Sequence, residues 1–252
     1  MSETITLHAP SAGQESTRRV WSASRVAGGL VLTSWAFLFW FLFLTGRVNL
    51  YLSTRTSWVV PVGAALLTAG AIGRLLAARV HSAEPLRTRE ALVMTLMVVP
   101  VVVVLALPTA TLGTFSASKK TTFSSVSFSS IYGQIGPDSE ITLLSIAAAQ
   151  TSTEGSLALA KRAGSDVDFV GFVTSYPDTP ADEFLLTRYV ITCCVADATI
   201  VQVRVVNVVP GKFAANDWVE VRGQIYPLGR EMILNSDTVV GVARPAKPYL
   251  TP

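Results

Sequence analysis

Three long apolar runs decide what this chain can fold into, because each is close to the length of a membrane-spanning helix. Such a helix needs roughly 20 apolar residues to cross about 30 Å of hydrocarbon. The runs cover residues 26–46, 58–80 and 91–112. They account for a composition in which 50% of the 252 residues are hydrophobic and only 15% are charged. We therefore predict an N-terminal half made of three transmembrane helices.

The first run contains no charge and is centred on the aromatic stretch Trp35–Leu44. An amphipathic helix of a soluble protein would show a polar face, and this run has none. A cleaved signal peptide is the alternative interpretation. The run is long for that, and the following Thr45-Gly46-Arg47 offers no small-x-small cleavage site. We interpret the run as a retained helix, preceded by a polar, disordered cytoplasmic tail at residues 1–25.

The second run carries small residues at every fourth position, and such a face lets another helix approach closely. These residues are Ala65, Ala69, Gly73 and Ala77. Ordinary small-residue filler would give the same pattern, and the spacing does not decide between the two. Arg74 lies near the end of the run, so we expect its charge to snorkel to the interface. In the third run, Pro100 and Pro108 predict kinks.

Positive charges near the predicted spans indicate which side faces the cytoplasm. Seven basic residues lie in the tail or around the loop between the second and third runs: Arg18, Arg19, Arg25, Arg74, Arg79, Arg87 and Arg89. Four lie on the other side: Arg47, Arg55, Lys119 and Lys120. We therefore predict a multi-pass protein of the plasma membrane, in contact with lipid, whose N-terminus is cytoplasmic and whose C-terminal domain is extracytoplasmic.

The C-terminal half has two parts. Residues 113–165 are Ser/Thr-rich at first, which predicts an extended connector, and then show apolar patterns that predict one or two short helices. Residues 166–252 predict a small all-β domain, because apolar residues alternate in segments joined by Gly, Pro, Asn and Asp. The expected strands are 169–175, 184–195, 199–206, 217–223 and about 231–242. Five short strands favour an OB-like five-stranded barrel, with a β-sandwich as the alternative.

The charge of this β-domain argues against a nucleic-acid partner. Between residues 166 and 252 there are ten acidic and seven basic residues, so its net charge is about −3. Nucleic-acid binding depends on a basic surface that contacts phosphates. The sequence pI of 9.0 comes instead from arginines that flank the predicted membrane spans.

Both cysteines of the chain are adjacent, at Cys193 and Cys194, and Asp197 follows three residues later. If the second strand continues through the thiols, alternation places Cys193 on the core side with Tyr189. Cys194 then points outward near Arg188. A neighbouring guanidinium lowers the pKa of a thiol and makes thiolate available. Arg188 and Tyr189 are therefore candidate supporting residues.

Three hypotheses for the thiol pair remain open. Free cysteines are often simply small core residues. Thiolates also favour zinc or copper(I), which makes Cys193, Cys194 and Asp197 candidate ligands of a soft metal ion, with a further ligand from a partner. This domain has no histidine, however, and Cys-Cys-x-x-Asp is not an established ligand spacing. The third hypothesis is redox chemistry or thiol exchange, although the Cys-x-x-Cys motif is absent.

No other catalytic constellation is present in the outer domain. The only histidines are His8 and His81, which excludes a Ser/His/Asp set or an HExxH site there. Walker and GxSxG motifs are missing as well. The acidic pair Asp182-Glu183 fits a solvated turn better than an acid/base dyad. We therefore predict that the chain is not an enzyme.

Three blocks of the C-terminal half resemble the YcgQ-like permease-subunit family of bacteria. They are Gly171-Phe172-Val173, the run Arg188–Ala198 with its Cys-Cys-x-Ala-Asp-Ala segment, and Trp218–Gly223. The blocks cover most of residues 169–223, while the membrane half matches in layout more than in residues. The polar tail ahead of the first helix is longer than the family usually has.

This resemblance implies a small membrane protein that works with a larger, multi-spanning permease, often encoded beside it. It also implies a link to metal homeostasis through neighbouring metallochaperone-type proteins. We therefore expect an accessory or regulatory subunit of a permease complex. A membrane-anchored thiol or redox protein, and a structural envelope anchor without chemistry, are the alternatives.

Overall fold

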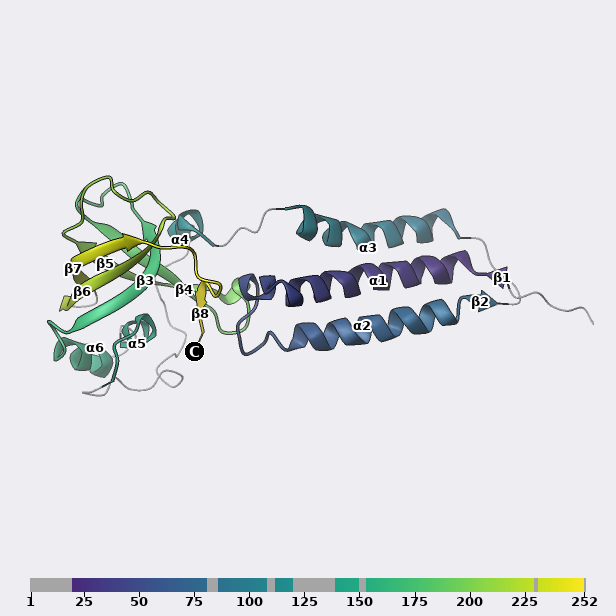
Figure 1. Cartoon of the computed structure of the whole chain (residues 1–252), viewed down its shortest axis with the longest axis horizontal. Helices are drawn as coiled ribbons and strands as arrows, with labels where there is room; N and C mark the ends of the chain where they lie inside the picture. Colours follow the sequence, from purple (N-terminus) through teal and green to yellow (C-terminus); the bar gives the residue numbers. More distant parts are fainter. Residues whose placement is uncertain are drawn as a thin grey trace, which may run out of the picture. The chain divides into compact units, whose positions relative to one another are not determined.

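The computed structural model confirms the predicted fold class: three long apolar helices are followed by a five-stranded mixed β-barrel (Figure 1). It describes residues 20–80, 86–107, 112–119, 139–149, 153–228 and 231–251. Most of the expected tail, Pro108 and residues 120–138, which include most of the Ser/Thr-rich stretch, lie outside the described residues. The chain divides into two units. One contains residues up to Phe39 and Gly63–Ala106, and the other contains Trp40–Val62 and Leu107–Pro252.

Each of the three apolar helices has the length and the composition needed to cross a membrane. They are α1 (Ala23–Leu44), α2 (Val59–Leu76) and α3 (Thr88–Ala106). The multi-pass membrane character expected from the apolar runs follows from these three helices. Charged side chains are confined to their end turns: Arg25 in α1, Arg74 in α2, and Arg89 and Glu90 in α3.

Within the helical unit, α1 and α2 are antiparallel neighbours. A two-residue ladder joins β1 (Val20–Trp21) to β2 (Arg79–Val80). The two helices also approach closely at Gly29, because a Cβ atom at this position would collide with the Leu75 side chain. Helix α3 continues through Pro100. The Trp35 indole N–H donates to the carbonyl of Met97, one turn before that proline, at 3.0 Å.

Five strands close the barrel in the order β3-β6-β7-β5-β4, with β4 returning to β3. All these pairs are antiparallel except β5 with β7, which is parallel. Followed around the barrel in the other direction, the order is β3-β4-β5-β7-β6, or first-second-third-fifth-fourth along the chain. This is the OB arrangement, and it excludes the β-sandwich alternative. The bounds are β3 Asp166–Thr174, β4 Phe184–Val190, β5 Thr199–Val206, β6 Trp218–Leu228 and β7 Glu231–Gly241.

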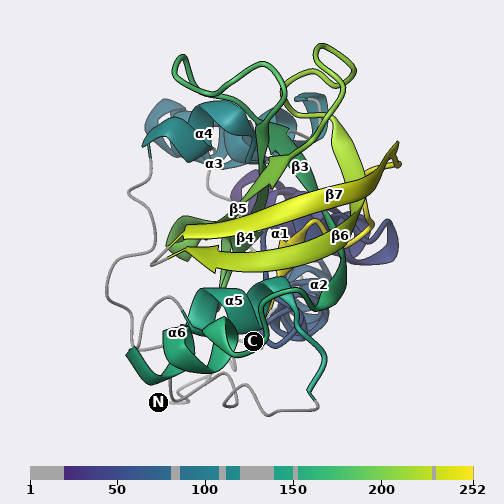
Figure 2. The same cartoon turned by 90° about the vertical axis from the view of Figure 1, so that its left-hand side faces the viewer.

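The barrel interior is filled by apolar side chains from all five strands and from two short helices. These helices, α5 (Leu143–Ala149) and α6 (Thr153–Ala160), lie at one end of the barrel (Figure 2). Ile146 and Leu159 bring them into the same core as Leu234 of β7. Both short helices were expected as part of a linker, and their side chains belong to the barrel core.

A second apolar cluster covers the outside of β3, β4 and β5. It consists of Ala117, Phe172, Tyr189, Ile191, Ala198, Ile200 and Tyr249. Ala117 comes from α4 (Thr114–Lys119), where the sequence predicted an extended connector. Tyr249 comes from β8 (Tyr249–Leu250), which pairs in parallel with the end of β4. We call this group the outer cluster.

Strand facing was predicted correctly for β5 and β6 and wrongly for β4. Val203 of β5 and Val221 of β6 point into the core, as their alternation predicts. The core side of β4 is formed by Phe184, Leu186 and Val190. The sequence pattern favoured instead the residues that alternate with them, such as Tyr189. The physical reason is that the outer cluster buries the other face of β4 as well, so both sets are apolar.

Candidate functional site

The adjacent thiols lie in a turn that begins where β4 ends. The strand stops at Val190, five residues before the predicted end of the strand at 195. The Asp197 carboxylate accepts hydrogen bonds from the backbone N–H of Thr192 at 3.1 Å and of Cys193 at 2.7 Å. Side-chain acceptors of this kind compete with strand ladders for backbone donors. Asp197 therefore folds the chain back into a tight turn.

Both cysteines are free; Cys193 is exposed and Cys194 is half-buried. Their Sγ atoms are 3.6 Å apart. The prediction that Cys193 packs inward and Cys194 outward is wrong, because the alternation of β4 ends before either residue. The turn instead presents the two sulfurs side by side.

The first interhelical loop, residues 45–58, holds this turn. The Cys193 carbonyl accepts hydrogen bonds from the backbone N–H of Ser53 at 3.1 Å and from the Thr56 Oγ1 hydroxyl at 2.6 Å. The backbone N–H of Val195 donates to the Tyr51 carbonyl at 2.8 Å. We call these three bonds the loop clamp. Sequence reasoning missed it, because its partners are more than 130 residues apart and most of its acceptors and donors are backbone groups.

Charge near the turn keeps Cys193 protonated. The hydrogen bond to Asp197, and then that to Cys194, raises the pKa of the Cys193 thiol to about 11. For Asp197, partial burial opposes ionisation, but hydrogen bonds from Cys193 and Thr192 prevail and lower the pKa of its carboxyl. The thiolate is the nucleophilic form of cysteine. Cys193 is therefore not an activated nucleophile, and a bound cation would be favoured beside the carboxylate.

Arg188 is not beside the thiols as predicted but buried in the wall of the barrel. Its guanidinium donates to the carbonyls of Val170 at 3.0 Å and Lys247 at 3.3 Å, and it lies over the Trp218 ring at 5.2 Å. Burial lowers the pKa of Arg188 to about 10, so it remains charged at neutral pH. The β3–β4 ladder ends at the pair Phe172–Thr187. Arg188 is the next residue of β4, and it closes the seam where these strands separate.

Tyr189, the second predicted supporting residue, binds the connector that follows α3. Its hydroxyl donates to the Gly113 carbonyl at 2.9 Å, and its ring stacks on Phe172 with centroids 5.7 Å apart. Burial, followed by the neighbouring Tyr249, raises the pKa of the Tyr189 phenol. The Leu112 backbone N–H donates in turn to the Tyr249 hydroxyl at 3.4 Å. Tyr189 thus anchors the connector and does not contact the thiols in the described structure.

The thiol pair supplies two ligands for a metal and no complete site. Among the described residues there is no group of three or more His, Cys, Asp or Glu placed to hold a metal ion. With Zn–S bonds of about 2.3 Å, sulfurs separated by 3.6 Å subtend an angle of about 103° at the metal, close to tetrahedral. The described residues do not complete such a site, unless Asp197 becomes a ligand at the expense of the turn.

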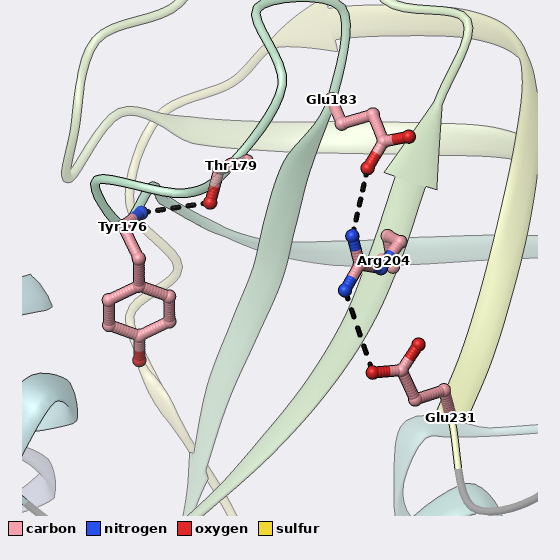
Figure 3. A network of polar contacts seen from close by, with 5 residues as sticks. All are labelled: Tyr176, Thr179, Glu183, Arg204 and Glu231. Carbon is pink, nitrogen blue, oxygen red and sulfur yellow. Dashed lines mark hydrogen bonds and ion pairs between the residues drawn. The ribbon is translucent and has the colours of Figure 1, made fainter.

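A separate polar network covers the outer face of β5. Arg204 pairs with Glu183 at 3.0 Å and with Glu231 at 3.5 Å (Figure 3). The hydrogen bond to Glu183 raises the pKa of Arg204. In the same figure the Tyr176 backbone N–H donates to the Thr179 hydroxyl. Glu183 is therefore an ion-pair partner. Because the two glutamates neutralise Arg204, the network does not present a basic surface.

Taken together, the geometry defines a membrane-helix protein that carries an OB-type barrel with an exposed dithiol turn. Residues 132–251, a range that contains the barrel with α5 and α6, match the model of the DUF1980 C-terminal domain family. A search of curated proteins and a search of solved structures both found no match. The YcgQ-like resemblance and its permease partner remain predictions.

Proposed function

We propose that this chain is an accessory or regulatory subunit of a membrane permease complex. The observation that carries the proposal is the small-residue face of α2. Ala65, Ala69 and Gly73 of this face are exposed, and so is Ala77, the residue that follows the end of α2 at Leu76. A Cβ atom built on Gly73 meets nothing within 4 Å. Small residues at helix interfaces allow backbones to approach closely in lipid, so this face fits a helix of another membrane protein.

The composition of the helices supports an accessory role over independent transport. Transport pathways through membranes use ionisable residues inside the bundle, often on discontinuous helices. In the described helices the charged residues lie only in the end turns, as at Arg74 and Glu90. Three helices of this kind offer no polar route, so the substrate path belongs to the partner.

The orientation in this proposal places the N-terminus in the cytoplasm and the barrel outside. The excess of arginines around the loop between α2 and α3 supports it. The loop clamp fits the three crossings themselves, because these put Ser53 of the α1–α2 loop and Cys193 of the barrel on one side in either orientation. The barrel would then dock at the external mouth of the permease.

The proposed activity of the outer domain is capture of a soft metal ion at Cys193 and Cys194. The close sulfurs and the neighbouring Asp197 carboxylate favour a cation such as zinc or copper(I). Because the two thiols are insufficient alone, the permease would supply the remaining ligands. The ion would pass from a half-site on this subunit to the transporter.

Affinity purification from native membranes in mild detergent tests the proposal. We expect the wild-type chain to recover a multi-spanning partner. Gly73→Leu should reduce recovery at least about tenfold, because bulk at a close helix contact removes more than 1.4 kcal/mol of packing. Gly73→Ala is the matched control and should retain the partner. Recovery of the wild-type chain alone would contradict the proposal.

A membrane-anchored redox protein is the second candidate, favoured by the exposure of Cys193. It predicts that Cys194→Ser abolishes a reductase or exchange activity without loss of fold. A structural envelope anchor predicts instead that replacing both cysteines changes nothing. Growth of the double variant under metal limitation and metal excess separates these outcomes, because only the metal-capturing subunit gives a metal-dependent defect.

A further inference from the structure

The loop clamp and the thiol pair share one peptide group. Cys193 provides the carbonyl that accepts from Ser53 and Thr56, and the same carbonyl carbon is bonded to the nitrogen of Cys194. The two Sγ atoms on either side of this peptide are 3.6 Å apart, and neither thiol is fully buried. A covalent link between the sulfurs would therefore close a ring that contains the carbonyl carbon of Cys193, whose oxygen is the acceptor of two of the three clamp bonds.

We propose that Cys193 and Cys194 form a reversible disulfide with each other, and that its formation releases the α1–α2 loop from the barrel. The proposal stands apart from the permease partner, since it concerns contacts within this chain. It limits metal capture to the reduced state, because a disulfide offers no thiolate ligands.

The adjacency of the cysteines makes such a bond labile. Cα atoms of successive residues lie about 3.8 Å apart across a trans peptide. Disulfides usually join Cα atoms that are about 4.4–6.8 Å apart, and shorter spans store strain. Strained and exposed disulfides have more oxidising potentials and are the regulatory ones. A Cys193–Cys194 bond would thus be easily reduced, as a switch requires.

Release of the loop follows from the geometry of the ring. Closing it must bring the sulfurs from 3.6 Å to about 2.05 Å, and the intervening peptide has to rotate to allow this. Cys194 lies in extended backbone, with φ −157° and ψ 170°, and forms an antiparallel bridge with Leu52. Rotation of the peptide turns the Cys193 carbonyl away from Ser53 and Thr56. Of the three bonds of the loop clamp, the one from Val195 to Tyr51 then remains.

The oxidant in this proposal is a small-molecule disulfide, and the reaction is thiol–disulfide exchange. Cys194 attacks a sulfur of the oxidant as the thiolate, because Cys193 is held protonated, and this forms a mixed disulfide and expels one thiolate. The second cysteine attacks the protein sulfur of the mixed disulfide and expels the other. The two cysteines lose two electrons and two protons in total, and the oxidant becomes two thiols.

Full-length protein in detergent is equilibrated with oxidised and reduced glutathione in varying ratio. Intact mass and alkylation report the thiols, and the rate of tryptic cleavage after Arg55, an exposed residue of the loop, reports the clamp. We expect a loss of two hydrogen atoms within a monomer. Cleavage should become about tenfold faster, the factor that the loss of one to two ordinary hydrogen bonds gives an opening equilibrium.

Two controls make the outcome decisive. A Cys193→Ser, Cys194→Ser chain should be cleaved at the reduced rate whatever the glutathione ratio. Thr56→Val lacks the hydroxyl of the clamp and keeps both thiols. Its reduced form should be cleaved faster than reduced wild type, and its cleavage rate should increase less on oxidation. Disulfide-linked dimers, or an internal disulfide that leaves cleavage after Arg55 unchanged, would overturn the proposal.

Discussion

The helical unit and the barrel unit satisfy their apolar surfaces in different ways. In the most apolar stretches of α1, α2 and α3, only 17%, 17% and 6% of residues are buried. In the barrel, side chains such as Val203, Val221 and Leu234 are completely buried by the chain itself. The barrel therefore contains the contacts that stabilise it. The helices depend on lipid or on a partner protein for most of the contacts that cover their apolar side chains.

The largest expected effect comes from making the same substitution, leucine to alanine, in each unit. Leu234→Ala in the barrel core should lower the free energy of unfolding by about 2–5 kcal/mol, because a cavity remains where methyl groups were packed. Leu66→Ala in α2, where the leucine is 69% exposed, should change it by less than about 0.5 kcal/mol. Thermal unfolding followed by circular dichroism measures both. Equal losses would mean that α2 is packed within the chain after all.

The next test concerns charge, and it compares two arginines of the barrel. Arg188→Met should cost about 2–3 kcal/mol, because the carbonyls of Val170 and Lys247 lose a charged donor and the seam between β3 and β4 opens. Arg222→Met removes two ion pairs, to Asp168 and Glu220, and should cost much less than Arg188→Met because the side chain is exposed. Chemical denaturation of the two variants measures the difference. A reversed order would show that the surface pairs stabilise the barrel more than the buried guanidinium.

These two arginines also show where sequence reasoning succeeds. Alternation in β6 correctly placed Arg222 outside, because the core contacts only one face of that strand. In β4 the same rule failed for Arg188, because β8 and α4 bury the second face. The apolar character of a residue does not say which of two buried faces it occupies. The barrel class was therefore predictable from the sequence, and the facing of its most enclosed strand was not.

A smaller effect is expected at the connection between the two regions. Tyr189→Phe keeps the stacked ring and removes the hydroxyl that binds the Gly113 carbonyl. We expect a loss of about 0.5–1.5 kcal/mol. Hydrogen exchange in α4 should become faster while the barrel core keeps its protection. Tyr226→Phe, which removes an exposed hydroxyl bonded to Gln224, is the control and should leave α4 unchanged. Unchanged exchange in α4 of Tyr189→Phe would show that other contacts hold the connector.

The candidate site was predictable in its residues and not in its geometry. Two thiols and a carboxylate within five positions drew attention to Cys193, Cys194 and Asp197. Their arrangement depends on Asp197 accepting from backbone N–H groups and on Ser53 reaching the turn from a distant loop. Neither contact leaves a periodic signal in the sequence. The loop clamp, which joins the thiol turn to residues 51–56, could only be seen in three dimensions.

The smallest expected effect lies within the helical unit, at the bond from Trp35 to Met97. Pro100 lacks a backbone N–H, and its ring disturbs the preceding turn of α3, so a carbonyl there benefits from a donor on α1. Trp35→Phe should cost about 0.6 kcal/mol, the usual strength of such bonds between membrane helices. Unfolding in mixed detergent measures it, with Trp58→Phe, an exposed tryptophan of the loop, as the control. A loss several times larger would mean that one polar contact holds α3 to α1, and the helical unit would then be as self-contained as the barrel.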